Sequence, residues 1–334
     1  MSAFVYGVYL CTGSNVKEQA TTIIIKPSGC KVKKTFNKKN VSDLKKFIDG
    51  LSQHDELVIL TGSSQQLAAL PKSFYKKFLT PHKGEHYFFL FNEQEPAKHQ
   101  LDLQDIHLST GELLFVVPNQ IHTSPPLKKG IKFSALSFEP RCLTLLPRQF
   151  SFLIDPLNRQ TISFDNESRQ RVKILFQTLG QLLHDDKTRN NIDLILVYIN
   201  ALLTEFDHAY FKTIRVKNIT GNKLSKYTQF KVIIEAEFKK QPSVNSIAEK
   251  LLLSQNQLYA IVKEFSGLPP KEYLIQRSML EAQRILFYEK STAKELAYEL
   301  GFADPDYFSR LFKKYTGKNI STFLIHLQDL SRQK

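Results

Sequence analysis

Two stretches near the C-terminus carry side chains whose hydrogen-bonding groups match the edges of DNA bases. Asn256 and Gln257 carry amides that can form paired bonds with adenine, and the Arg310 guanidinium can donate two bonds to guanine O6 and N7. Lys263 is better suited to a phosphate. Asp306 has two interpretations of equal weight, a bond from cytosine or charge complementarity with a helix N-terminus. The predicted contact residues are Gln255, Asn256, Gln257, Tyr259, Ala260 and Lys263 in the first stretch and Pro305, Asp306, Ser309, Arg310 and Lys313 in the second.

Both stretches lie in a sequence that repeats at a shift of about fifty residues. Apolar residues spaced by three, one and three positions occur at 244–251 and 293–300, and again at 258–265 and 308–315. This spacing puts one apolar stripe on each of four short helices. A polar turn separates the two helices of each copy, so the sequence predicts two helix-turn-helix units.

The second helix of each copy is bounded by residues that favour helix ends. Ser254 and Asp304 are good N-caps, and Gly267 and Gly317 stand where each helix must end in a positive φ. The predicted elements are recognition helices at 254–266 and 304–316 and a bridging helix over 271–288. The bridging helix is about 27 Å long at 1.5 Å per residue, which suits two major grooves about 34 Å apart.

The region from about residue 223 to 330 resembles the AraC/XylS family of transcriptional regulators. The closest stretch, KELAYELGFADPDYFSRLFKK at 294–314, corresponds to the family's IA-x-x-x-GF turn and YFSR-x-FKK recognition helix. LPPKEYL after Gly267 and LEAQRIL in the bridging helix are also similar. The resemblance implies a homodimeric, sequence-specific regulator that contacts double-stranded DNA and RNA polymerase. Ala260 departs from it, because the family often has a long basic or polar side chain there, so the first unit is expected to contact fewer bases.

A helical-hairpin repeat that binds protein is the alternative to DNA binding. Only two copies are present, whereas a solenoid needs about three, and the outward positions of the second helices are polar or basic. The net charge of the chain is +14 at pH 7, and residues 214–334 hold about twenty Lys or Arg against about twelve Asp or Glu. These features favour DNA, and an architectural binder with little sequence preference stays open.

Residues 73–160 contain short apolar runs separated by Gly and Pro turns, a pattern that indicates β-strands. The order of strands, Gly-Glu turn and PNQIH resembles the cupin-like barrel that AraC-like regulators carry before their DNA-binding part. The resemblance implies a small-molecule effector, and His82, His86 and His122 are assigned to it. Their spacing lacks the H-x-H pattern of cupin metal sites, so neither a metal nor a cofactor is expected.

Residues 161–213 read as two helices broken near 185–190. Each helix has an apolar stripe, which includes Val172 and Phe176 in the first and Ile199 and Leu203 in the second. Such a hairpin either packs on the barrel or pairs with a second protomer, and we favour pairing in a homodimer. Residues 217–226, with Gly and Asn, are the expected linker to a DNA-binding domain at 224–334.

Residues 1–72 are expected to form a small α/β unit to which no role is assigned. FVYGVYL, TTIIIK, CKVKKTF and ELVILTG predict strands, and VSDLKKFIDGLS at 41–52 predicts a helix. The lysines between 31 and 39 are expected to guard an edge strand rather than to bind nucleic acid. The predicted fold class is therefore multidomain α+β, with an all-α C-terminal domain.

The sequence lacks the residue patterns of common enzymes. It has no Gly-rich phosphate loop, G-x-S-x-G elbow or metal-spaced Cys/His set, so no catalytic residue is assigned. The alternative is a DNA-modifying or repair enzyme fused to an AraC-type domain, in which Cys11, Cys30 or Cys142 accepts a methyl group. No apolar run approaches the roughly 18 residues of a membrane span, and no signal peptide is expected. Together with the odd cysteine count, this predicts a cytoplasmic protein.

Overall fold

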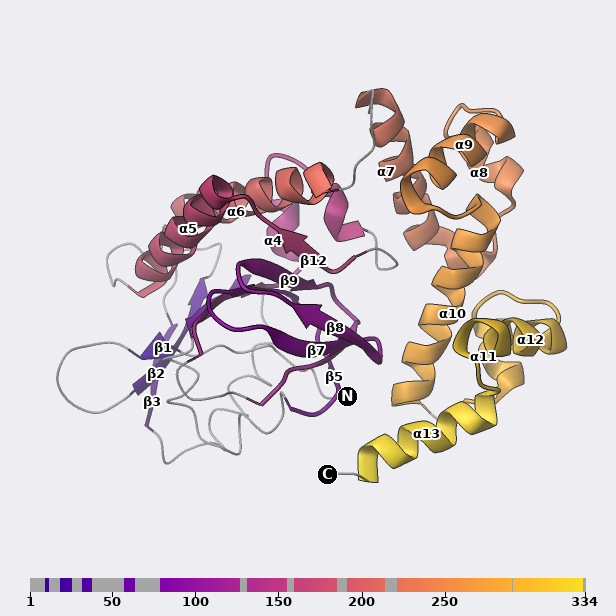
Figure 1. Cartoon of the computed structure of the whole chain (residues 1–334), viewed down its shortest axis with the longest axis horizontal. Coiled ribbons are helices and arrows are strands. Elements are labelled where there is room, and N and C mark those ends of the chain that lie inside the picture. The colour runs from indigo at the N-terminus through magenta and orange to yellow at the C-terminus, as the bar shows by residue number, and fades with distance from the viewer. Residues whose placement is uncertain are drawn as a thin grey trace. The chain divides into compact units, whose positions relative to one another are not determined.

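The computed structural model describes residues 10–11, 19–25, 32–37, 57–63, 79–126, 131–154, 159–184, 191–213, 221–289 and 291–332. The chain divides into two compact units, whose elements are labelled in Figure 1. Unit 1 consists of residues 1–150 and 159–213, and unit 2 consists of residues 151–158 and 214–334.

Unit 1 is built on two antiparallel sheets. The larger sheet has the strand order β1-β2-β4-β11-β6-β9-β12, with β3 also paired to β2, and the smaller sheet has the order β5-β10-β7-β8. The strands of the larger sheet are β1 (Leu10–Cys11), β2 (Gln19–Ile25), β3 (Val32–Asn37), β4 (Leu57–Ser63), β6 (Tyr87–Asn92), β9 (Glu112–Val116), β11 (Phe133–Phe138) and β12 (Thr161–Ser163). Those of the smaller sheet are β5 (His82–Lys83), β7 (Ala97–Leu101), β8 (Gln104–Leu108) and β10 (Ile121–Thr123).

Strands that precede residue 72 are part of the larger sheet. β4 pairs with β11 from Ser63↔Ser134 to Ile59↔Phe138, and β2 pairs with β4 in turn. These backbone hydrogen bonds cross the predicted domain boundary at residue 72. Local patterns do not reveal such a pairing, because its partners lie far apart in the chain. The predicted helix at 41–52 lies outside the described residues.

One core cluster of unit 1 joins the two sheets, which both contribute buried side chains to it. The cluster consists of Phe88, Leu114, Val116, Phe133 and Ala135 from the larger sheet and Leu101 and Leu108 from the smaller one. Removal of these side chains from water is the main force that holds the sheets face to face. Strand pairing among the described residues does not close the two sheets into one barrel.

Two long helices, α5 (Asn166–His184) and α6 (Ile192–Thr213), form the predicted hairpin and cover the larger sheet. The ring of Phe176 in α5 lies 6.2 Å from that of Phe91, and Phe206 in α6 lies 5.6 Å from Phe89. The apolar stripes pack on the sheet, where Val172 and Ile199 are fully buried. Pairing of the hairpin with a second protomer stays a prediction. A short helix, α4 (Arg141–Thr144), precedes the hairpin.

Unit 2 is helical and contains the two predicted helix-turn-helix units. Its elements are η1 (Ser151–Ile154), α7 (Gly221–Glu237), η2 (Phe238–Lys240), α8 (Val244–Lys250), α9 (Gln255–Ser266), α10 (Pro270–Tyr288), α11 (Ala293–Glu299), α12 (Pro305–Thr316) and α13 (Ile320–Arg332). The bridging helix α10 contacts both α9 and α12. In Figure 1, α8 and α9 lie toward one end of α10, and α11 to α13 lie toward the other.

Helix α7 corrects the predicted linker at 217–226, because the helix begins at Gly221. Tyr227, Phe230 and Ile234 recur at helical spacing and are buried, so this helix is held by packing despite the Gly and Asn at its start. Within the part of the chain that the structure describes, no helix is both long and apolar enough to cross a membrane.

Candidate nucleic-acid interface

Hydrogen bonds at the helix starts fix the two turns. The Ser254 hydroxyl accepts from the Gln257 N–H at 3.2 Å, and Gln257 Oε1 accepts from the Ser254 N–H at 2.9 Å, which makes a capping box at the start of α9. Asp304 Oδ1 accepts from the Asp306 N–H at 2.9 Å at the start of α12. Both N-caps were predicted, and both are confirmed.

The ends of both helices are also as predicted. Gly267 and Gly317 have φ of +74° and +71°, the left-handed conformation that glycine adopts at low cost. The apolar stripes point inward: Leu258, Ile261, Val262 and Phe265 of α9 and Phe308, Leu311 and Phe312 of α12 are buried. Each helix therefore turns its remaining face to solvent.

The six predicted contact residues of α9 are all exposed. Two of the amides already bond locally, since Gln257 closes the capping box and Gln255 Nε2 donates to Asn245 Oδ1 at 2.9 Å. Lys263 Nζ donates to Tyr259 Oη at 3.4 Å and lies over the same ring. Asn256 and Ala260 face solvent.

On α12, Asp306, Arg310 and Lys313 are exposed, whereas Pro305 and Ser309 are half-buried. The Ser309 hydroxyl donates to the Pro305 carbonyl at 2.8 Å, so its proton is engaged within the helix. The Arg310 side chain is 69% exposed, and its Nη2 lies 3.8 Å from Asp304 Oδ2. An exposed ion pair of this length contributes little free energy, which leaves the guanidinium able to bind elsewhere.

A buried ion network joins α7 to α10 behind the two exposed faces. Arg277 Nε donates to Glu235 Oε1 at 2.8 Å, and its Nη1 donates to Glu281 Oε2 at 2.9 Å. The guanidinium also lies 4.2 Å from the centre of the Phe238 ring. Burial alone disfavours the charged guanidinium, but Glu235 and Glu281 outweigh it and raise the pKa of Arg277. The network joins α7 to α10, the helix that contacts both α9 and α12.

The turn after α7 ties the two helix-turn-helix units together. Gln241 Nε2 donates to Ser278 Oγ at 2.9 Å and to the Leu300 carbonyl at 3.0 Å, at the end of α11. Gly301 has a φ of +79°, and a Cβ there would lie 2.0 Å from the Lys239 carbonyl oxygen. Only glycine allows this approach. Sequence reasoning missed Arg277 and Gln241, because Glu235, Ser278 and Leu300 lie far from them in the chain.

The histidines assigned to an effector lie in unit 1. His82, His99 and His122 stand on β5, β7 and β10, with the His82 and His122 ring centroids 5.6 Å apart. His99, which was not in the predicted set, places Nδ1 3.3 Å from His122 Nε2. Burial lowers the pKa of His86 and of His99 to about 4, so both are neutral at pH 7. Among the described residues, no group of three or more His, Cys, Asp or Glu has the geometry to hold a metal.

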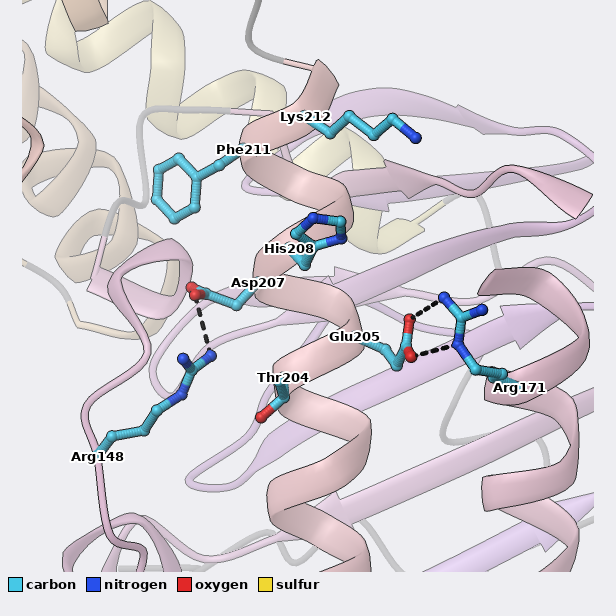
Figure 2. Close-up of a pocket in the computed structure, with 8 residues that line it drawn as sticks. All are labelled: Arg148, Arg171, Thr204, Glu205, Asp207, His208, Phe211 and Lys212. Carbon is cyan, nitrogen blue, oxygen red and sulfur yellow. Dashed lines mark hydrogen bonds and ion pairs between the residues drawn. The ribbon is translucent and has the colours of Figure 1, made fainter. Parts of the chain in front are cut away.

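Unit 1 also has a pocket of about 570 Å³ on the hairpin side (Figure 2). Its lining residues are Arg148, Arg171, Thr204, Glu205, Asp207, His208, Phe211 and Lys212. Arg148 pairs with Asp207 at 3.1 Å, and Arg171 pairs with Glu205 at 2.6 Å, as the dashed lines show. Both guanidiniums are thus paired with carboxylates of α6, and Lys212 pairs with Asp165 at 2.9 Å.

Comparison with known proteins matches residues 247–324 to a helix-turn-helix domain. The Msm operon regulatory protein of Streptococcus mutans is 38% identical over 101 residues, which cover 30% of this chain and 36% of that protein. The lactose operon transcription activator of Staphylococcus xylosus is 24% identical over 164 residues, which cover 48% of this chain and 58% of that protein. The chain therefore spans less than two thirds of these relatives.

Among solved structures, the C-terminal domain of the two-component response regulator yesN from Fusobacterium nucleatum is 31% identical. The match covers 28% of this chain and 93% of the yesN domain, with a TM-score of 0.28. The segment matched by the family model contains α9 to α12 and hence both recognition helices and the bridging helix. Residues 247–324 of this chain therefore match a helix-turn-helix domain.

Proposed function

We propose that the protein is a sequence-specific transcriptional regulator that inserts α9 and α12 into adjacent major grooves of double-stranded DNA. The observation that carries the proposal is the pair of capped helices whose polar faces are exposed while both are held by α10. With its 19 residues, α10 is about 28 Å long, close to the spacing of successive major grooves. The names of the relatives, an operon regulator and a transcription activator, support the same function and favour activation.

We assign base reading chiefly to Arg310 on α12 and Asn256 on α9. Arg310 is exposed and loosely paired, as a donor of two bonds to guanine must be. Asn256 is exposed, whereas Gln257 would have to leave its capping box to bond adenine. Lys263 and Lys313 are assigned to phosphates, and Asp306 to the helix start or to cytosine. The remaining predicted residues, Gln255, Tyr259, Ala260, Pro305 and Ser309, would line the contact.

For the rest of the chain we propose regulatory roles. Residues 73–160 would form a cupin-like domain that binds a small effector near His82, His86 and His122. The histidine row on the inner side of the smaller sheet supports this, since buried imidazoles offer hydrogen bonds to a polar ligand. Residues 161–213 would form a homodimer contact. Ile174 and Val197 remain 60% and 61% exposed on the hairpin, which leaves apolar surface for a second copy.

We further propose that the protein acts without catalysis, in the cytoplasm, together with RNA polymerase. Burial raises the pKa of the Cys142 thiol, which disfavours the thiolate that a methyl acceptor needs. This argues against the fused repair enzyme at that position. The relatives' names, which describe regulation of transcription, support a protein that works beside RNA polymerase on chromosomal DNA.

The test is a gel-shift titration with duplexes enriched by the purified full-length protein from a random pool. Binding to the enriched duplex and to a scrambled one is compared at two salt concentrations. A regulator binds the enriched duplex at least about a thousandfold more tightly at moderate salt. Equal binding to both duplexes, with a steep loss at high salt, would identify an architectural binder instead.

A further inference from the structure

A short segment in the middle of the unit 1 sequence belongs structurally to unit 2. Residues 151–158 cluster with the helices of unit 2, although the chain on both sides of them forms unit 1. The described part of this segment is the 3₁₀ turn η1, Ser151–Ile154, which we call the strap. The two units are thus joined where the chain enters the segment, where it leaves it, and again at 213–214.

The strap is seated on α7 by packing and by a buried charge. Phe152 is fully buried and Leu153 is 5% exposed. The Thr228 hydroxyl donates to Ser151 Oγ at 3.1 Å, and Lys231 Nζ donates to the Ser151 carbonyl at 2.9 Å. Lys231 is only 1% exposed, and a buried ammonium is costly unless oxygen atoms accept from it. Displacement of the strap would therefore remove the Ser151 carbonyl oxygen from the buried Lys231 ammonium.

From α7 the contacts continue to the first recognition helix. The Lys231 ammonium lies 5.0 Å from the centre of the Tyr227 ring, and that ring stacks on Phe265 of α9 with centroids 4.9 Å apart. One turn earlier, Lys226 Nζ donates to the Leu251 carbonyl at 2.7 Å, in the turn between α8 and α9. The stretch of α7 from Lys226 to Lys231 therefore contacts both the strap and the first helix-turn-helix unit.

We propose that the strap is the element through which unit 1 controls the first helix-turn-helix unit. The chain of unit 1 ends at residue 150 before the strap and resumes at 159, just ahead of β12. A rearrangement of that part of unit 1 displaces the strap, and the position of the strap determines how α7 packs against α9. The second helix-turn-helix unit, with helices α11 to α13, contacts α10 and the Gln241 side chain instead. The proposal depends on the proposed function only for the binding of DNA by α9. The link from the strap to α9 is supported separately by the contacts given above.

The first experiment tests the link without DNA, by hydrogen exchange on the full-length protein. Phe152→Ala removes the buried ring of the strap, and we expect exchange in α7 and α9 to speed up at least about tenfold while α11 to α13 are unchanged. The matched control is Phe323→Ala, which removes a ring that is 5% exposed in α13 and lies 5.3 Å from Phe312. The control should loosen α12 and α13 and spare α7. Unchanged α7 and α9 in Phe152→Ala, or equal loosening of all the helices of unit 2, would overturn the proposal.

The second experiment tests control, because coupling between two sites must act in both directions. Hydrogen exchange is measured on the full-length protein with and without the enriched duplex. In the wild type, DNA should slow exchange in the strap and in β12 as well as in α9. In Phe152→Ala, and to a smaller degree in Lys231→Met, DNA should still slow exchange in the helices of unit 2 but should no longer slow it in the strap and in β12. DNA that protects α9 and leaves the strap and β12 unchanged would contradict control through the strap. Failure to bind any duplex would contradict the proposed function, whereas the first experiment would still decide the link.

Discussion

Units 1 and 2 bury their ionisable side chains in different ways. Unit 1 encloses imidazoles, among them His86 and His99, whose pKa burial lowers to about 4, so these side chains are neutral at pH 7. Unit 2 encloses the guanidinium of Arg277, which stays charged because Glu235 and Glu281 contact it. The interior of unit 1 can therefore gain charge within an accessible pH range, whereas that of unit 2 forms a fixed frame behind two exposed helices.

The largest expected effect is the loss of unit 1 at acid pH. Above pH 6.5 both imidazoles are neutral in the folded and the unfolded chain, so they do not affect stability. Below it, the unfolded chain binds protons that the folded unit does not bind until about pH 4. The free energy of unfolding of unit 1 should thus fall through this window, by about 3 kcal/mol for each imidazole at pH 4. Calorimetry at pH 7 and pH 5 should show that the melting temperature of unit 1 falls while that of unit 2 stays the same.

Two variants sharpen this comparison of the units. His99→Gln removes a buried imidazole whose pKa is lowered, so it should flatten the pH dependence of the free energy of unfolding. His107→Gln, which replaces an exposed side chain on β8, is the matched control. Among the described residues of unit 2 no histidine is buried, so unit 2 lacks this source of pH dependence. Transitions that move together by the same amount would break the contrast.

The next largest effect is expected for Arg277→Ala, which breaks the frame of unit 2. Removal of one partner leaves Glu235 and Glu281 partly buried without their cation, and such losses cost about 3–5 kcal/mol. The melting temperature of unit 2 should fall while that of unit 1 is unchanged. Lys250→Ala, which removes an exposed pair with Glu237, is the control and should leave both transitions in place. A stable unit 2 in Arg277→Ala would show that the network does not hold the frame.

A smaller and more selective effect is expected for Arg310→Ala. Affinity for the enriched duplex should fall by about 1–3 kcal/mol, and affinity for scrambled DNA should change far less. Lys313→Ala, one turn further along α12, should instead weaken binding to both duplexes equally and reduce the salt dependence by about one ion. Equal losses on both duplexes in Arg310→Ala would move Arg310 to the phosphate contacts.

The smallest effect is expected for a gain-of-contact change in α9. Ala260 is exposed and lies where the family often has a long polar side chain, so Ala260→Arg adds a cation to the DNA-facing surface. Affinity should rise slightly and the salt dependence should increase by about one ion. Ala260→Leu lacks the charge and serves as the control. Weaker binding in Ala260→Arg would indicate that α9 approaches DNA through another face.

Unit 2 was predictable because its signals are local. The three-one-three spacing, the N-caps Ser254 and Asp304 and the glycines at 267 and 317 all act within one or two helical turns, and the structure confirms each of them. The start of α7 was missed, because Gly221 and Asn222 resemble a linker and the helix is held by tertiary packing.

Long-range features were beyond sequence reasoning for a common physical reason. The pairing of β4 with β11, the bond of Arg277 to Glu235 and the contact of His99 with His122 join residues that no local period relates. The stripes of α5 and α6 were read correctly as apolar, but the same stripe suits a sheet or a second protomer. Only the aromatic contacts with Phe89 and Phe91 distinguish the two.

The central claim is that α9 and α12 read two successive grooves, and a base-resolved footprint of the full-length protein on the enriched duplex tests it most directly. The account predicts two protected patches about 10 base pairs apart. Arg310→Ala should weaken protection chiefly in one patch and Asn256→Ala chiefly in the other. A single protected patch, or two patches that both variants weaken equally, would contradict the account.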